Sequence, residues 1–184
     1  MKVNNESAVS PVVGVMLMLV VVIIIAAVVS AFAGGAVSGV KKVPQATITG
    51  KFSISNGLQI IHAGGDGLAT ADTVFLIRDG SMFGQNLDQK TAQVLNKTLI
   101  TDSNGNLLDN GQGISNVTSF MSGNTLFISG TNAACQYLQP GVWAGDPDQS
   151  LCISNPANVG KTFSLEVSDK SGNLISKSDV TISP

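Results

Sequence analysis

The chain has 184 residues, a formal net charge of −2 and a pI of about 5.1. Charged residues make up only 12% of it, which is about half of the usual share. The ten Lys and Arg residues are scattered, and Lys41-Lys42 is their only adjacent pair. This distribution excludes a basic nucleic-acid-binding surface, so no nucleic-acid partner is expected.

Apolar residues are concentrated in about the first forty positions. The rest is rich in Ser, Thr, Asn, Gly and Asp, with short apolar runs between them. This later part is long enough to bury one hydrophobic core. The sequence therefore predicts one long apolar segment followed by a single polar domain.

The apolar run extends from Val12 to Ala33 and is interrupted only by Gly14 and Ser30. A helix needs about 20 apolar residues to cross the hydrocarbon core of a membrane. Lipid imposes a helix on the run despite its many Val and Ile residues, because backbone polar groups find no water there. Ser10-Pro11 suits an N-cap followed by the first helical residue, so the helix is predicted to begin at about residue 11.

A cleaved secretion signal fits this segment poorly, because the apolar region of such a signal is about 7–15 residues long and follows a basic head. The head here, MKVNNES, has only Lys2 beside the amino terminus. Cleavage near Ala33 or Gly35 stays as an alternative. Lys41 and Lys42, taken alone, would keep the C-terminal domain inside the cell, but the features of that domain indicate the outside.

The short polar leader and the stretch AVSPVVGVMLMLVVVIIIAAVVSAFAGG closely resemble the N-terminal segment of archaeal type IV pilins, over about a fifth of the chain. The resemblance implies a structural subunit that is not an enzyme and has no cofactor. It also implies that a prepilin peptidase removes the leader on the cytoplasmic side, and that the helix first sits in the membrane and then packs into a filament core. The matching cut falls between Ala8 and Val9, with the Ser7–Ala8 bond as the alternative.

Two positions depart from the pattern. Ser7 stands where a basic residue often precedes the cut by two positions, which leaves the exact bond less certain. Val13 stands at the fifth position of the mature helix, where bacterial pilins have an acidic residue. The second departure fits the archaeal branch of the family.

A filament core surrounds each helix with other helices, so it requires a helix that is apolar on every face. Small residues within the run let helices approach closely. A helix that contacts lipid alone is the alternative, and the two are not separated by composition. The residues predicted to form the filament core are Pro11, Gly14, Leu17, Val21, Ile24, Ala27, Val28 and Ala31.

A hinge is predicted after the run, because Gly34, Gly35 and Gly39 weaken the helix and Pro44 ends it by about Val43. The expected organisation is a leader at residues 1–8, a helix at 9–43 and a head domain at 44–184.

Short alternating apolar runs follow, separated by Asn-Gly, Asp-Gly and Ser-Gly-Asn turns. Strands are expected within residues 46–55, 58–63, 73–80, 97–108, 119–130 and 163–183, with Phe163, Leu165 and Val167 on one face. No helical pattern occurs after Pro44. The predicted fold class is α+β: a long hydrophobic helix and then an antiparallel, immunoglobulin-like β-sandwich.

Cys135 and Cys152 are the only cysteines. A redox pair or half of a metal site is one interpretation, but two thiols without further ligands make a poor zinc site. A disulfide is favoured; it would close a loop rich in Gly, Pro and Asp and contribute about 3 kcal/mol. A disulfide also indicates that the domain lies outside the cell.

Asn96-Lys-Thr and Asn116-Val-Thr are candidate N-glycosylation sites in the predicted head, whereas the same motif at Asn5 lies in the leader. His62 and Asp66 suggest a catalytic or metal pair, although a strand followed by a Gly-rich turn explains them better. The H-x-G-G-D step is also similar to one in archaeal pilin heads. The stretch DSNGNLLD, residues 102–109, is faintly like a calcium loop, but a hairpin turn is favoured because the Gly and Glu of such a loop are missing.

The sequence is therefore interpreted as an archaeal type IV pilin, with no metal and no catalytic residue. The implied partners are copies of itself in a helical polymer, a prepilin peptidase, and a pilus assembly ATPase with its membrane platform. The expected location is the cell membrane for the single-pass precursor and the cell surface for the filament, where adhesion is the role that the resemblance implies. A monomeric, membrane-anchored extracellular binding protein is the first alternative, and a secreted or anchored hydrolase is the second.

Overall fold

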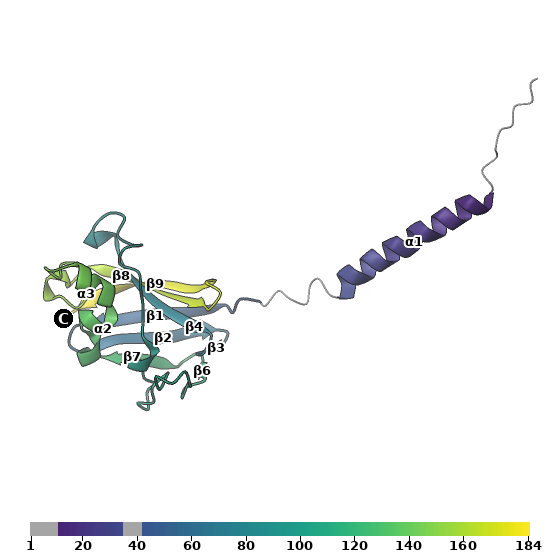
Figure 1. Cartoon of the computed structure of the whole chain (residues 1–184). Helices are drawn as coiled ribbons and strands as arrows, with labels where there is room; N and C mark the ends of the chain where they lie inside the picture. The colour runs from purple at the N-terminus through teal and green to yellow at the C-terminus, as the bar shows by residue number, and fades with distance from the viewer. Residues whose placement is uncertain (1–10, 35–41) are drawn as a thin grey trace, which may run out of the picture. The chain divides into compact units, whose positions relative to one another are not determined.

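The structure is a computed structural model that describes residues 11–34 and 42–184. The chain divides into two compact units. Within the described residues, the first unit contains one helix, and the second, Val43–Pro184, contains the strands (Figure 1).

Helix α1 spans Pro11–Gly34 and begins at the predicted residue. Pro11 suits the first helical position, where its missing N–H has no intrahelical partner to lose. At about 1.5 Å per residue the 24 residues extend about 36 Å, which exceeds the hydrocarbon core of about 30 Å. The predicted continuation of the helix toward residue 43 falls on residues 35–41, which lie outside the described ranges.

The β-domain has nine strands in two sheets within the described residues. The strands are β1 Ala46–Ser53, β2 Gly57–Gly65, β3 Leu68–Ala69, β4 Thr73–Asp79, β5 Gln93–Val94, β6 Ser119–Phe120, β7 Thr125–Ser129, β8 Thr162–Asp169 and β9 Leu174–Ser183. Two short α-helices, α2 Cys135–Leu138 and α3 Pro140–Gly145, lie together beside the sheet (Figure 1). The 3₁₀ turns are η1 Ser81–Phe83, η2 Lys97–Leu99, η3 Gly130–Ala133 and η4 Pro156–Asn158.

The larger sheet has seven strands in the order β5-β4-β8-β9-β1-β2-β7, and β3 pairs with β6 in the smaller one. All the strand pairs are antiparallel except β1 with β9, which run parallel at Phe52–Ile182 and Ser53–Ser183. This pair joins two antiparallel halves into one sheet. The prediction of a mostly antiparallel β-domain is confirmed, whereas the immunoglobulin-like sandwich is only partly supported, because the domain has one large curled sheet and a second sheet of only two short strands.

The core lies inside the curled sheet. Phe163, Leu165 and Val167 of β8 are all buried, as the alternation predicted. The ring of Phe163 meets that of Phe52 edge-on at 5.6 Å between centroids, and Phe75 meets Phe120 at 6.3 Å. The first contact joins β8 to β1, which are not neighbours in the larger sheet, and the second joins β4 to β6 of the smaller sheet, so one continuous core lies between these strands.

The head differs from the sequence-based expectations in two details. Residues 97–108 form η2 and an isolated bridge of Thr101 with Leu107 in place of an ordinary strand pair, because Asn96 caps the turn and starts a 3₁₀ helix. The sequence shows no helical pattern of any length after Pro44, and the short helices α2 and α3 were therefore not predicted. With four and six residues, these helices are too short to leave an apolar period in the sequence.

Candidate assembly helix and the polar sites of the head

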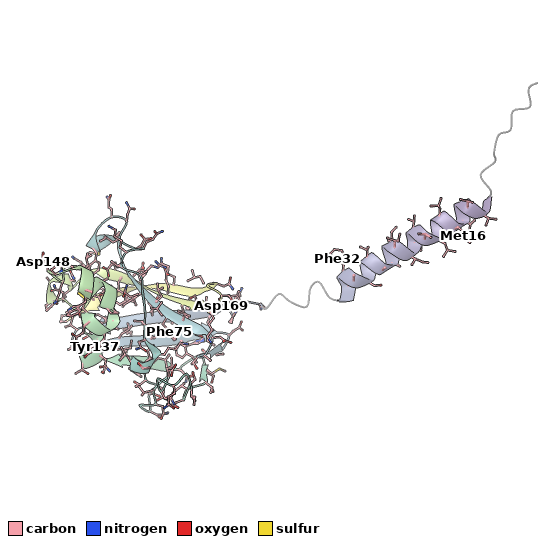
Figure 2. The ribbon with its side chains drawn as sticks, in the orientation of Figure 1. Met16, Phe32, Phe75, Tyr137, Asp148 and Asp169 are labelled. Atoms are coloured by element: carbon pink, nitrogen blue, oxygen red, sulfur yellow. A yellow bond between two sulfur atoms is a disulfide. The ribbon has the colours of Figure 1, made fainter. Side chains whose placement is uncertain are left out.

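Every described side chain of α1 is exposed, and most of them are apolar. The large apolar residues range from 47% exposed at Val13 to 73% at Met18. Figure 2 shows the side chains of α1, with Met16 and Phe32 labelled, pointing away from the helix axis. The helix has no acidic residue in its first turn and no basic residue in its last. By length and composition it is able to cross a membrane.

The predicted core residues of α1 occupy one side of the helix. The residues Gly14, Leu17, Val21, Ile24, Val28 and Ala31 follow one another at spacings of three and four, and such spacing places side chains on a common face. Ala27 lies beside this row. Leader residues Ala8 and Val9 fall outside the described ranges. The structure therefore brings the helix residues into one stripe, and their packing role stays a prediction.

The C-terminal half of α1 also carries two rows of small residues. Ala26, Ser30 and Gly34 are spaced by four, as are Ala27 and Ala31. Residues four apart are neighbours on a helix surface, so the rows lie side by side and leave a shallow strip between bulkier side chains. Strips of this kind let two helix backbones approach closely in lipid or in a dry core.

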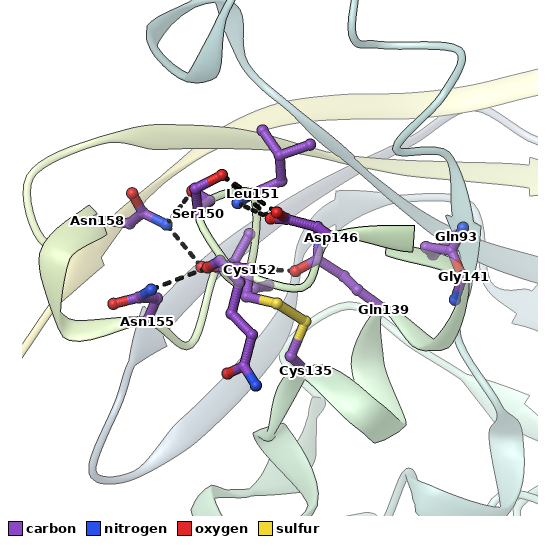
Figure 3. The surroundings of a disulfide bond; sticks show 12 residues. Gln93, Cys135, Gln139, Gly141, Asp146, Ser150, Leu151, Cys152, Asn155 and Asn158 are labelled. Carbon is purple, nitrogen blue, oxygen red and sulfur yellow. Dashed lines mark hydrogen bonds between the residues drawn. A yellow bond between two sulfur atoms is a disulfide. The ribbon is translucent and has the colours of Figure 1, made fainter. Parts of the chain in front are cut away.

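The predicted disulfide is present. Cys135, at the start of α2, is bonded to Cys152; their Cα atoms are 5.5 Å apart, and the two residues are 17 positions apart in sequence (Figure 3). Both are buried in a small cluster with Val142 and Leu151, separate from the main core. The residues from Cys135 to Asn158, called the disulfide segment below, thus have their own covalent and apolar centre.

The disulfide segment is tied internally by polar side chains. The carboxylate of Asp146 accepts the Leu151 N–H at 2.7 Å and the Ser150 hydroxyl at 3.1 Å. The Asn158 amide donates to the carbonyl of Cys152 at 2.7 Å (Figure 3). These bonds give hydrogen-bond partners to backbone groups in a region without regular strands, because buried N–H and C=O groups are costly when they are unpaired.

A buried polar pair was missed by the sequence-based reasoning. Asp79, the last residue of β4, is 4% exposed, and Gln139 is fully buried. The Gln139 amide donates to Asp79 Oδ1 at 3.0 Å, and its own oxygen accepts the Ile153 N–H at 2.7 Å. The alternation of Thr73, Phe75 and Ile77 would have pointed Asp79 inward, and that phase was the available signal.

The second oxygen of Asp79, Oδ2, is buried without a hydrogen-bond partner in the structure. Burial raises the pKa of Asp79 to about 7, and the hydrogen bond from Gln139 and the charge of Lys161 offset only part of that rise. A buried carboxylate is costly unless it is paired, so the neutral acid is favoured up to about neutral pH.

His62 and Asp66 do not form a catalytic pair. The ring of His62 is fully buried on β2, and its Nε2 is 2.9 Å from the backbone carbonyl oxygen of Asp66, not from its carboxylate. The ring also packs edge-on against Phe120 at 5.1 Å. Asp66 holds the start of the domain: its N–H donates to the Gln45 carbonyl at 2.7 Å, and its carboxylate accepts the Gln45 N–H at 3.1 Å.

The loop that starts at Asp102 is a hairpin turn, as favoured. Both carboxylate oxygens of Asp102 accept hydrogen bonds from within the loop: from the Asn104 and Asn106 N–H groups at 2.8 Å and from the Asn106 side chain at 3.0 Å. Asp169 closes the β8–β9 turn with the same bonds to Ser171 and Asn173. Among residues 11–34 and 42–184, no group of three or more His, Cys, Asp and Glu residues is placed to hold a metal ion.

The two sequons differ in local structure, although both asparagines are exposed. Asn96 caps η2, and its Oδ1 accepts the Thr98 N–H at 3.0 Å and the Thr98 hydroxyl at 2.9 Å. Asn116 lies in the loop before β6. Both positions are accessible to a modifying enzyme, and glycosylation itself stays a prediction.

Comparison with known proteins connects the chain to one family through its N-terminal part. No curated protein matches the chain. A family model described as archaeal type IV pilin, N-terminal, matches residues 7–48, a range that contains the whole of α1 and the start of β1. The chain therefore carries the N-terminal segment of the archaeal type IV pilins, and this match supports its assignment as an archaeal type IV pilin.

Proposed function

We propose that this chain is the structural subunit of an archaeal type IV pilus, in which α1 packs with its copies into the filament core. The β-domain forms the outer surface. The observation that carries the proposal is an uncharged helix of 24 residues, exposed on every described side, within a range that matches the pilin family. About twenty apolar side chains in water would aggregate, so α1 needs lipid or other helices around it.

Both environments suit α1 in succession. Before assembly, the helix anchors the precursor in the cell membrane, because it is long enough to span the hydrocarbon core. During assembly, an ATPase and its membrane platform transfer the helix from lipid to the filament, where neighbouring helices replace lipid. Because α1 has no charged residue, the transfer moves no charge between environments.

The head is proposed to lie outside the cell. The disulfide between Cys135 and Cys152 supports this orientation, because such bonds persist in oxidising surroundings. The charge bias of Lys41 and Lys42 opposes it, but long domains are translocated largely regardless of such charges. Glycans at Asn96 and Asn116, both exposed, would then cover part of a surface that serves adhesion.

The leader is proposed to end at Ala8, with Val9 as the first residue of the mature subunit. The decisive experiment is to shear filaments from the cells, purify them and sequence the subunit N-terminus. A start at Val9 in sheared filaments supports the pilus proposal, and a start at Ala8 moves the cut to the alternative bond. A chain that still begins at Met1 and occurs only in membranes contradicts it.

That last outcome would favour the alternative of a monomeric, membrane-anchored extracellular binding protein. The alternative predicts that detergent, and not shear, releases the chain from cells. It uses α1 only as an anchor and gives no reason for the rows of small residues in its C-terminal half.

A further inference from the structure

The disulfide segment is attached to the sheet at few polar points. In the part of the chain that the structure describes, the side-chain hydrogen bonds from this segment to the strands are the bond from Gln139 to Asp79 of β4 and the bond from the Gly141 N–H to Gln93 of β5 at 3.0 Å. Leu138 and Ile153 add apolar contacts, since both are fully buried in the main core. The segment thus rests on the edge of the sheet formed by β4 and β5.

Gln139 is the central connector of this attachment. Its amide nitrogen donates to Asp79, and its amide oxygen accepts the backbone N–H of Ile153, the residue after Cys152. A single fully buried side chain therefore links a strand of the sheet to both ends of the disulfide loop. A change in the charge of Asp79 therefore acts directly on the hydrogen bond that attaches Gln139 to the sheet.

We propose that Asp79 is a proton-dependent latch, which holds the disulfide segment on the sheet while its carboxyl group is neutral and loosens the segment when the carboxyl group ionises. The geometry carries this proposal. One carboxyl oxygen is bound by Gln139, the other is buried without a partner, and ionisation would leave a charge in that buried position. Detachment of the segment would give the charged oxygen access to water.

The charged groups around Asp79 do not remove this cost. Lys161, in the stretch before β8, lowers the pKa of Asp79, but its ammonium group also lies 4.8 Å from the centre of the Phe83 ring. Asp146, just after α3, acts in the opposite direction. Arg78, next to Asp79 in sequence, is engaged with Glu166 at 2.9 Å. Asp88 lines a shallow hollow with Asp79 at the loop after β4.

The sign of the effect follows from the pKa of Asp79, which is raised to about 7 in the attached state from 3.8 in water. Between these values the attached segment keeps a proton that the released one loses. Release therefore becomes more favourable by about tenfold per pH unit as the pH rises through this window, and levels off above a pH of about 7. The disulfide persists throughout, so the released segment stays a closed loop that carries the exposed Tyr137 and Trp143.

Hydrogen exchange on the full chain in detergent micelles tests the proposal. Exchange of the peptide that contains Ile153 is measured at pH 5, 6, 7 and 8 in the wild type and in Asp79→Asn, which mimics the neutral acid. Dividing the two rates at each pH cancels the chemical pH dependence of exchange. The wild-type to variant ratio should rise at least tenfold from pH 5 to pH 8, while peptides of β2 show no such rise.

A ratio that stays constant overturns the latch, and so does a rise of equal size in β2, because that would mean unfolding of the whole domain. Asp179→Asn is the matched control, since Asp179 is an exposed carboxyl on β9 and should leave the ratio unchanged.

Trp143, the only tryptophan of the chain, gives a second measurement, which uses the wild-type protein alone and so does not depend on whether a variant folds. It lies half-exposed on α3 within the disulfide segment. Its fluorescence in the wild type should change between pH 5 and pH 8 with a midpoint far above that of an ordinary Asp. A flat signal over this range, which is what a midpoint near 4 would give, contradicts the proposal.

Discussion

Ser176 of β9 hydrogen-bonds both backbone groups of Ile48 on β1: its hydroxyl accepts the Ile48 N–H at 2.9 Å and donates to the Ile48 carbonyl at 3.3 Å. The parallel register of the two strands is confined to Phe52–Ile182 and Ser53–Ser183. Near the start of β1, the side chain of Ser176 thus takes the place of backbone hydrogen bonds between β1 and β9. This contact helps to join the two halves of the curled sheet into one core.

Ser176→Ala should therefore destabilise the β-domain by about 1–3 kcal/mol, because it leaves two backbone groups of Ile48 without their partner. Urea unfolding of the full chain in detergent, followed by circular dichroism, measures the change.

Ser178, two residues further along β9, is the matched control. Its hydroxyl is buried without a hydrogen-bond partner in the structure. Ser178→Ala removes an unsatisfied group and should leave stability unchanged or slightly higher. Equal losses in the two variants would show that the Ser176 bridge contributes nothing specific.

The small residues of α1 distinguish a filament core from a lipid anchor. Ala27→Leu keeps the helix apolar, so membrane insertion of the precursor should be unaffected. The added side chain fills a row where helices are proposed to approach closely, and the amount of sheared filament should fall at least several-fold. Immunoblots of the membrane and sheared fractions measure the two quantities.

Val28→Leu is the control for that substitution. The side chain of Val28 is already bulky, and its replacement by Leu adds only one carbon. It should assemble nearly as well as the wild type. Normal filament yield from Ala27→Leu would argue against close helix packing at this row.

Loss of the disulfide should lower the free energy of unfolding of the β-domain. Replacement of both Cys135 and Cys152 by Ala removes the cross-link over 17 positions, and we expect a loss of about 3 kcal/mol. Thermal unfolding with and without reductant gives the test. Reductant should lower the unfolding temperature of the wild type and leave the double variant unchanged, and a similar drop in both would point to another cause.

Glu166 should make the β-domain sensitive to acid. Its carboxylate lies between Arg78 at 2.9 Å and Lys177 at 3.0 Å. Burial raises the pKa of Glu166, but the hydrogen bonds and charges of these two partners outweigh burial and lower it below 4.5. The stabilisation is therefore present above about pH 4.5 and is lost as the pH falls through the lower pKa of the folded state.

Glu166→Gln should cost about 1–2 kcal/mol at neutral pH and flatten the decline in stability below pH 4.5. Urea unfolding at pH 3, 4, 5 and 7 measures both effects. Asp148→Asn, at an exposed carboxyl, should retain the wild-type pH profile. An unchanged acid decline in Glu166→Gln would exclude the ion-pair cluster as its source.

Glycosylation predicts a mass change at each sequon. Asn96→Gln and Asn116→Gln should each lower the intact mass of filament subunits by the mass of one glycan. Thr98→Ala removes the hydroxyl that bonds Asn96 Oδ1 and should have the same effect as Asn96→Gln. Subunits whose wild-type mass equals that of the mature polypeptide would contradict both sites.

The sequence by itself determined the features that depend on neighbouring residues. An uncharged run of membrane length predicts α1, and Ser10-Pro11 predicts its start, because capping and lipid burial act within a few turns. Alternation predicted β4, β8 and the burial of Phe163, Leu165 and Val167. With only two cysteines and no further metal ligands beside them, their pairing was the favoured outcome.

Tertiary structure alone decided what depends on distant residues. The Ile48–Ser176 bridge joins positions 128 apart, and the Asp79–Gln139 bond joins positions 60 apart. Neither leaves a periodic trace, because each depends on how the sheet curls and on which strands become neighbours. The parallel β1–β9 pair, the short helices α2 and α3, and the choice of Gln139 as the partner of Asp79 are set by that packing, which local propensity does not encode.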